Sequence, residues 1–169
     1  MNEGFKNWLG GLLDGDGTFT ISLTIKNNSI LVTPNIRIGL KSVDGWILDY
    51  IHKESNIGKI YESNKGKDFA VKVWQTTNVY DSLELAKIIV PYTKLKTEKG
   101  KKFIEICELI KNTDRIHHSR QKGSKSRTKQ EIIEIVKGAT HLNPDRQSVR
   151  FRDYKDWDWW KKTIDRLYG

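Results

Sequence analysis

Residues 8–22 read WLGGLLDGDGTFTIS, and the organisation of the chain follows from this stretch. An apolar, glycine-rich run ends in Asp14 and Asp16, and each of these acids is followed by a glycine. A polar–apolar alternation then runs from Gly17 to Lys26, which predicts a strand with one apolar and one polar face. Carboxylates are unfavourable at a helix C-terminus, which already carries partial negative charge, unless a cation offsets them. The stretch therefore predicts a helix, half of a divalent-metal site and a strand in direct succession, although Asp-Gly pairs also occur as ordinary helix stops.

The composition indicates a soluble, globular chain with a polyanionic partner. The chain has 169 residues, a formal net charge of +9 and a pI near 9.5. This charge favours nucleic acid as the partner, although a basic surface can also serve solubility alone. The sequence shows no run of 18 apolar residues and no secretion signal, and its single cysteine, Cys107, excludes an internal disulfide. We therefore expect an intracellular protein, cytoplasmic or organellar, that has no membrane segment and carries a buried, non-catalytic Cys107.

Hydrophobic periodicity predicts an α+β fold. The elements alternate as helix, two strands, helix, two strands and helix, and further helices follow. Two hairpins interrupted by a helix form a single antiparallel four-stranded sheet, with helices on its apolar face and a polar face left open. The expected helices are residues 6–13, 44–55, 79–90 and 97–112, and the expected strands are residues 17–26, 32–41, 58–63 and 68–76.

The last third of the chain has a different composition. Residues 115–129 hold six Lys or Arg and no acid, which indicates a loop or linker. Helical periodicity returns before Gly138, the expected stop, and again over residues 156–169. We expect a core domain over residues 1–112 and, over residues 113–169, a basic loop with a helical extension packed on the same domain.

The stretch LGGLLDGDG, residues 9–17, resembles the LAGLIDADG motif of the homing endonucleases. Gly10 and Gly15 replace alanines of the motif and Leu13 replaces an isoleucine, which are variants of similar size. The order of helices and strands, the length and the basic charge agree with this family over about residues 5–112. Only one copy of the motif is present, so the resemblance is to the single-motif, intron-encoded type, whose members act as homodimers. It implies a sheet that presents a concave polar face to DNA.

The resemblance also implies roles for residues of the motif. Asp16 corresponds to the metal-binding acid, and the carbonyl of Gly15 is a second candidate ligand. The implied cofactor is Mg²⁺ or Mn²⁺, and Ca²⁺ is expected to bind without supporting cleavage. Carboxylate and carbonyl oxygens with water also suit Mg²⁺ on chemical grounds. Asp14 corresponds to an acid that mainly caps and packs the motif helices, and the helix over residues 6–16 forms the homodimer contact.

Two further residues are carried over as catalytic. The segment PYTKLK, residues 91–96, matches a PFLKLK-like segment of the family. Lys96 would there orient or activate the attacking water or stabilise phosphate charge, and a solvated lysine without such a role is the alternative. The family often has glutamine at the end of the second strand, and IGLKSVD departs from that pattern. Of Leu40 and Lys41 we choose Lys41, because leucine cannot hold a water and Lys41 lies on the polar face.

The polar face of the sheet is the candidate DNA-reading surface, because a two-stranded β-ribbon fits the major groove. Arg37 suits guanine and Asn35 suits adenine, whereas an ordinary solvated sheet face is the alternative. The basic run at 115–129 either clamps phosphates or is a mobile charged loop. The candidate DNA-binding residues are Thr20, Ser22, Thr24, Lys26, Asn35, Arg37, Tyr61, Ser63, Asp68 and Lys72.

These features together predict a site-specific homing endonuclease. The resemblance implies hydrolysis of both strands of a long, pseudo-palindromic double-stranded DNA site, with divalent metal at the two Asp16 carboxylates and short 3′ overhangs in the product. Two alternatives stay open: an RNA-splicing maturase that binds intron RNA, and a sequence-specific DNA-binding protein that does not cleave. An intact Asp16 argues for cleavage, because the fold has no evident need for a second carboxylate in the motif.

Overall fold

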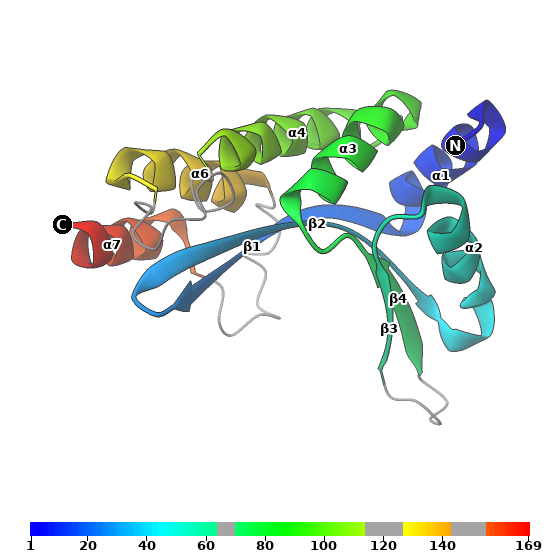
Figure 1. Cartoon of the computed structure of the whole chain (residues 1–169), viewed down its shortest axis with the longest axis horizontal. Helices are drawn as coiled ribbons and strands as arrows, with labels where there is room; N and C mark the ends of the chain where they lie inside the picture. Colours follow the sequence, from blue (N-terminus) through cyan, green and yellow to red (C-terminus); the bar gives the residue numbers. More distant parts are fainter. Residues whose placement is uncertain (64–69, 114–126, 143–154) are drawn as a thin grey trace, which may run out of the picture.

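A computed structural model describes residues 1–63, 70–113, 127–142 and 155–169. The chain forms the predicted α+β fold, with one four-stranded antiparallel sheet in the strand order β1-β2-β4-β3. Most of the helices gather on one face of the sheet, which arches so that its other face is concave (Figure 1). Asp68 and residues 115–126 of the basic run lie outside the described residues.

The helices and strands follow one another in the predicted order. The described helices are α1 (Glu3–Asp16), α2 (Trp46–Ser55), α3 (Val79–Ile89), α4 (Thr97–Asn112), α6 (Lys129–Leu142) and α7 (Trp157–Tyr168). The strands are β1 (Gly17–Lys26), β2 (Ser29–Lys41), β3 (Lys59–Ser63) and β4 (Val71–Gln75), and two short 3-10 turns are η1 (Ser42–Asp44) and η2 (Val90–Tyr92). Among the described helices, none has the length and apolar character needed to cross a membrane.

The direct step from α1 into β1 depends on Gly17. A Cβ atom at this position would lie 2.3 Å from a side-chain carbon of Leu13 and 2.7 Å from its Cα, so a larger residue would collide with the last turn of the helix. The backbone N–H of Gly17 also donates to the carbonyl of Leu13, which closes that turn. The last glycine of the motif therefore allows a strand to begin at the residue after Asp16.

The strand register separates an apolar face of the sheet from a polar one. Phe19 pairs with Ile36, and Ile38 pairs with Trp74, and all four side chains are fully buried. Residues one step away along each strand point to the opposite face, which carries no described helix, and Arg37 is among them. We call this second surface the open face.

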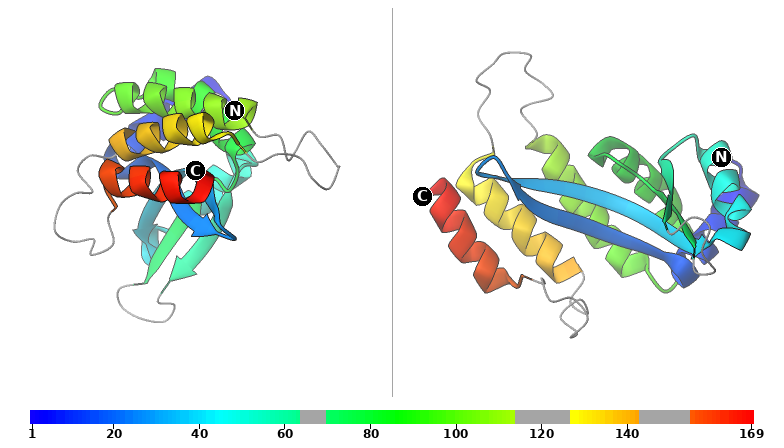
Figure 2. Two further views of the ribbon diagram at one scale, coloured as in Figure 1. Left: turned by 90° about the vertical axis from the view of Figure 1, so that its left-hand side faces the viewer. Right: turned by 90° about the horizontal axis from the view of Figure 1, so that it is seen from below.

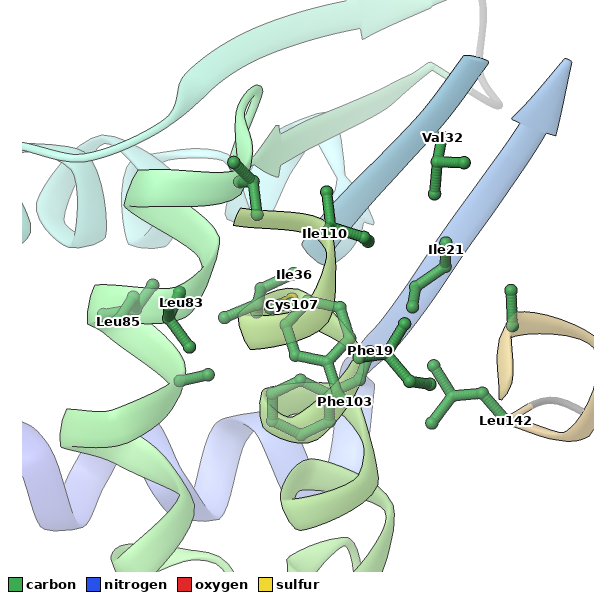
Figure 3. Packing of buried hydrophobic residues seen from close by; sticks show 14 of the residues in the cluster. Phe19, Ile21, Val32, Ile36, Leu83, Leu85, Phe103, Cys107, Ile110 and Leu142 are labelled. Atoms are coloured by element: carbon green, nitrogen blue, oxygen red, sulfur yellow. The ribbon is translucent and has the colours of Figure 1, made fainter. Parts of the chain in front are cut away.

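One hydrophobic core joins the helices to the sheet. It contains buried side chains from all the described helices and from β1, β2 and β4. In this core the ring centroids of Phe19 and Phe103 lie 5.3 Å apart, and Cys107 and Leu142 lie close to the two rings (Figure 3). Burial, with a smaller effect from Glu108, raises the pKa of the Cys107 thiol to about 12, so this cysteine stays protonated, as expected for a packing residue.

Gly138 does not end its helix, contrary to the sequence prediction, because α6 continues to Leu142. A Cβ atom at Gly138 would lie 3.0 Å from the side chain of Ile106 on α4. The glycine therefore serves the close approach of two helices. A glycine needed for packing and a glycine that stops a helix look alike in a sequence.

Candidate functional site

The end of α1 is clasped by the segment between η2 and α4. The Asp14 carboxylate accepts hydrogen bonds from the backbone N–H groups of Lys94 and Lys96, at 2.5 and 2.9 Å. In return, the ammonium group of Lys96 donates to the carbonyls of Leu13, Asp14 and Gly17, at 2.7, 2.7 and 2.8 Å. A cation is thus bound at the C-terminal end of α1, which carries partial negative charge. We call this arrangement the Asp14–Lys96 clasp.

The clasp keeps Asp14 ionised. Partial burial alone would raise the pKa of this carboxyl, but the N–H groups of Lys94, Lys96 and Leu95 and the charge of Lys96 together outweigh it. The pKa of Asp14 therefore lies below its usual value. Both carboxylate oxygens accept a hydrogen bond from the clasping segment, so Asp14 serves to hold that segment on the helix.

Asp16, in contrast, presents a free carboxylate. It is the last residue of α1, it is exposed, and its side chain makes no hydrogen bond or ion pair with any residue that the structure describes. The carbonyl of the neighbouring Gly15 lies 3.5 Å from the ammonium of Lys96. A carboxylate and a carbonyl oxygen at an open helix end are donors that suit Mg²⁺, which keeps several waters of its own. The residues present therefore fit the implied metal.

The described residues of one chain do not form a complete metal site by themselves. Within the described ranges, no group of three or more His, Cys, Asp or Glu side chains is arranged to hold a metal ion. The exposed Asp16 carboxylate and the Gly15 carbonyl would leave most of the coordination shell to water, substrate or a second chain.

Lys41 lies where β2 ends, beside the end of α1. Gly17 pairs with Ile38, so the chain leaves α1 alongside the last residues of β2. Lys41 is exposed on the open face, whereas Leu40 faces the helices and packs against the core. The structure thus places Lys41 on the surface where the sequence predicted it, and its catalytic role stays a prediction.

Most predicted DNA-reading residues share the open face. The exposed ones in the described ranges are Ser22, Thr24, Lys26, Arg37 and Tyr61. Neither Lys26 nor Arg37 forms an ion pair with an acid in the described part of the chain, so both charges face solvent. Ser63 lies two residues beyond Tyr61 in β3, where its backbone pairs with Val71.

Thr20 and Asn35 also belong to the open face but are less accessible. Thr20 is only 5% exposed, and its hydroxyl donates to the carbonyl of Asn35 at 3.5 Å. The side-chain amide of Asn35 donates to the carbonyl of Thr33 at 3.0 Å, which holds its orientation. A contact of Thr20 with DNA would require the neighbouring side chains to move and expose it. Asn35 would present a side-chain amide whose orientation is already fixed by its hydrogen bond to Thr33.

The predicted placement of Lys72 on the polar face is wrong. Lys72 shares the helix-covered face with Trp74, and its ammonium group pairs with Asp49 of α2 at 2.6 Å. Its methylene chain occupies the space that a Cβ atom at Gly45 would need. In β4, residues 71–75 (VKVWQ), the two valines alternate with Lys72 and suggest that the apolar face is the one without the lysine. Trp74 is larger than either valine and is buried in the core, and Lys72 lies on the same face because it is two residues away.

The sequence prediction left out several open-face residues, among them Leu31, Thr33, Lys59 and Gln75. Leu31 is 50% exposed and pairs with Thr24, while Gln75 pairs with both Arg37 and Lys59. Steps of two back from Arg37 along the strand would have found Leu31 and Thr33. Finding Gln75 required the pairing of β2 with β4.

Two adjacent glycines of α1 face different neighbours. A Cβ atom at Gly10 would lie 2.6 Å from the backbone carbonyl oxygen of Tyr92, so Gly10 makes room for η2 of its own chain. A Cβ atom at Gly11 or Gly15 would meet nothing within 4 Å, and Trp8 on the same helix is 40% exposed. The small size of Gly10 and Gly11 in the sequence suggests that both let two motif helices approach closely. For Gly10 this interpretation is wrong, because η2 of the same chain fills the space beside it, and for Gly11 it stays a prediction.

Comparison with known families agrees with the motif at the end of α1. A family model described as LAGLIDADG endonuclease matches residues 9–112, which is more than half of the chain. The chain belongs to the LAGLIDADG endonuclease family. The matched region runs from α1 to the end of α4 and so includes the clasp, Asp16 and the whole sheet.

Solved structures of homing endonucleases share the fold of this LAGLIDADG endonuclease. I-CvuI, in complex with the I-CreI target in the presence of Mg with the DNA not cleaved, matches with a TM-score of 0.77 at 15% identity, over 99% of this chain and 96% of that one. The archaeal intron-encoded I-Vdi141I, complexed with DNA, matches with a TM-score of 0.74 at 20% identity, over 98% of both chains. I-AabMI, bound to uncleaved DNA, matches with a TM-score of 0.65 at 23% identity, over 92% of this chain and 50% of its own.

The solved structures differ in how much of their own length this chain covers. The LAGLIDADG endonuclease described here has one motif and spans nearly all of I-CvuI and I-Vdi141I, but only half of I-AabMI. At these identities the likeness to solved structures shows the fold alone.

Proposed function

We propose that this LAGLIDADG endonuclease is a homodimeric, divalent-metal-dependent homing endonuclease that hydrolyses both strands of a long, pseudo-palindromic double-stranded DNA site and leaves short 3′ overhangs. One observation carries the proposal. An exposed Asp16 carboxylate, unpaired within the described residues, stands where α1 meets the open face. A free acid at a helix C-terminus is unfavourable on its own, and a bound cation would make it favourable.

Asp16 and the Gly15 carbonyl would hold the metal. A bound Mg²⁺ or Mn²⁺ would lower the pKa of a coordinated water and neutralise developing charge on phosphate oxygens. Ca²⁺ would fill the same donor set without supporting cleavage. Two structures of I-CvuI with DNA, one in the presence of Mg and one in the presence of Ca, support this choice of ions.

Two lysines would assist Asp16. The Lys96 ammonium already binds the carbonyls of Leu13, Asp14 and Gly17, so its first contribution is to hold the end of α1 and thereby orient Gly15 and Asp16. Its positive charge at the same helix end would also favour a phosphate nearby. Lys41, exposed at the end of β2, would orient the attacking water or neutralise phosphate charge from the open face.

A second copy of the chain would complete the site. The outer side of α1 carries Gly11 and Gly15, which leave open space, and the partly exposed Trp8. Small residues allow two helix backbones to approach closely, so α1 can pack against its own copy about a two-fold axis. The match to half of I-AabMI also supports this arrangement, because two copies would equal that chain in length.

The open face would read DNA. Its two halves in a homodimer are related by two-fold symmetry, so the target would be pseudo-palindromic. Arg37 would bind guanine through its guanidinium group, and Ser22, Thr24, Lys26 and Tyr61 would make further base or phosphate contacts. The net charge of +9 supports binding that weakens steeply as salt is raised.

Selection from a randomised duplex pool would test the proposed function. The purified protein is incubated with the pool and Mg²⁺, and all new ends are sequenced. We expect recurrent ends with 3′ overhangs around one long motif, and their loss with EDTA or with Asp16→Asn. Asp158→Asn removes the same charge from an exposed acid on α7 and is the matched control, which should cleave like the wild type.

Filter binding separates the remaining outcomes. A protein that retains duplex DNA in the presence of Ca²⁺ but yields no ends with Mg²⁺ or Mn²⁺ would be a non-cleaving DNA-binding protein. A protein that retains structured intron RNA and no duplex DNA would be a maturase, and either result would overturn the nuclease.

A further inference from the structure

The C-terminal helix reaches the far tip of the first hairpin. The turn between β1 and β2 consists of Asn27 and Asn28, which have φ values of 52° and 56°. A two-residue turn with both residues in the left-handed region matches the twist of the flanking strands. The end of α7 lies beside this tip (Figures 1 and 2), although the two segments are far apart in the sequence.

A tyrosine at the end of α7 binds this tip. The phenol oxygen of Tyr168 lies 3.2 Å from the hydroxyl oxygen of Ser29, and the backbone N–H of Ile30 donates to the same phenol oxygen at 3.2 Å. Ser29 pairs with Lys26 across the turn, so the two hydrogen bonds hold β2 at its first residues. We call this contact the hairpin latch.

The helix that carries the latch is itself firmly attached. Trp160 and Ile164 of α7 are buried in the core, and Asp165 pairs with Lys129 of α6 at 2.9 Å. The α6 helix packs in turn against β1 and α4. Tyr168 is therefore carried by a helix, α7, that is packed into the main hydrophobic core.

The residues next to the latch have little support of their own. Thr24, Ile25, Lys26 and both turn asparagines are exposed. A hairpin end with few buried contacts is free to move, and a mobile side chain discriminates poorly between bases because it must be ordered on binding. Of these residues, Thr24 and Lys26 lie on the open face, and they are its residues farthest along β1 from Asp16.

We infer that Tyr168 is a positioning residue for DNA recognition, which holds the β1–β2 tip so that Thr24 and Lys26 meet the outer base pairs of each half-site in a fixed geometry. This inference rests on the proposed DNA-binding function. The latch itself contacts no DNA in this scheme. Its loss affects specificity at the ends of the site and leaves the centre, where Asp16 acts, unchanged.

Amide hydrogen exchange on the free protein tests the latch without DNA. In Tyr168→Phe, the Ile30 N–H loses its acceptor, and we expect its exchange rate to rise roughly fivefold, as one net hydrogen bond would give. Ser29→Ala keeps the Ile30 bond and should produce a smaller rise. Tyr80→Phe on α3 also removes one phenol oxygen and should leave Ile30 unchanged.

A specificity profile tests the function of the latch. Each base pair of the selected site is replaced in turn, and relative affinity and cleavage are measured for wild type, Tyr168→Phe and Tyr80→Phe. We expect Tyr168→Phe to tolerate replacements at the outer base pairs several-fold better than the wild type, to discriminate normally at the centre, and to cut the intact site at nearly the wild-type rate.

The two arms separate the possible failures. A wild type that neither binds nor cleaves any duplex would overturn the proposed function and with it the role of Tyr168 in recognition, while the exchange rates would still show whether the latch exists. A wild type that cleaves, together with a Tyr168→Phe profile identical to it, would overturn the inference alone. A uniform loss of discrimination at central and outer positions would also overturn it, because that pattern reports a general folding defect.

Discussion

At the scale of single residues, the two acids of the motif differ in what their carboxylates contact. Asp14 accepts hydrogen bonds from two backbone N–H groups eighty or more residues away in the sequence, whereas Asp16 has no partner among the described residues. A sequence shows both as an acid followed by glycine. The difference between a structural carboxylate and a free one became visible only when residues 94–96 were placed against the helix end.

Asp14→Asn tests the clasp through stability and its pH dependence. The amide cannot supply a charged acceptor, and we expect the free energy of unfolding to fall by about 1.5–3 kcal/mol at neutral pH, the range for hydrogen bonds to charged groups. The pKa of Asp14 is lowered in the folded state, so its stabilisation is present above the unfolded-state pKa and is lost as the pH falls through the folded-state pKa. The gap between wild type and variant should therefore close below about pH 4.

Urea titrations at several pH values measure this gap. Asp16→Asn is the control, since it removes a carboxylate from the same helix end without breaking a hydrogen bond with the described residues, and it should leave stability unchanged or slightly raised. A gap that persisted undiminished at pH 2 would show that the ionised carboxylate of Asp14 is not what holds the clasp.

Leu31 provides a test of base recognition at one residue. It is half exposed on the open face opposite Thr24, and apolar side chains in the major groove contact the methyl group of thymine. We expect replacement of one outer thymine by deoxyuridine in the selected site to weaken wild-type binding roughly fourfold, the effect of one buried methyl group. Leu31→Ser should bind both sites equally, and an equal loss in both proteins would place the methyl contact elsewhere.

At the scale of elements, the alternation of polar and apolar residues predicted the bounds of β1 and the two faces of β1 and β2 correctly. Each of these strands is long and has one face covered by helices, so the alternation extends over many residues. The same reasoning failed for β4, where only five residues are available and one tryptophan outweighs two valines. It failed at Gly138 because helix packing and helix termination both select glycine. The sequence pattern therefore predicts the faces of long strands, whereas contacts between elements decide the face of a short strand and the role of a glycine within a helix.

Gly10→Ala and Gly11→Ala form a matched pair that separates packing within the chain from packing between chains. At Gly10 the added methyl group would lie 2.6 Å from a backbone oxygen, and we expect a loss of about 1–3 kcal/mol in the free energy of unfolding. At Gly11 it would meet nothing in its own chain, and the stability of the single chain should be unchanged or raised by up to about 1 kcal/mol.

Sedimentation velocity then measures what Gly11→Ala does to association. If two α1 helices pack through this side, the added methyl groups separate their backbones, and the dimer should dissociate at concentrations where the wild type does not. An unchanged dimer constant for Gly11→Ala would mean that the two chains associate through another surface.

At the scale of the whole molecule, the family resemblance marks Asp16 and Lys96 in the sequence as candidate site residues, but the arrangement around them depends on distant contacts. The clasp joins residues about eighty positions apart, and the hairpin latch joins residues 139 positions apart. In the proposed homodimer the remainder of the site would come from a second copy of the chain, and a single sequence indicates this only through an incomplete set of ligands. The number of active acids per cleaved site is therefore a property to measure on the assembled protein.

Mixed dimers count those acids directly. If wild-type and Asp16→Asn chains are co-expressed in equal amounts and assort at random, about a quarter of the dimers carry two intact acids. Cleavage of both strands requires an acid at each scissile phosphate, so the double-strand cleavage rate should fall to about a quarter of the wild-type rate. Chains that act as independent monomers would retain about half of it, and a mixture with Asp158→Asn should retain all of it. Mass spectrometry of the mixture fixes the ratio of the two chains, so a result near one half at an equal ratio would exclude a site shared between two copies.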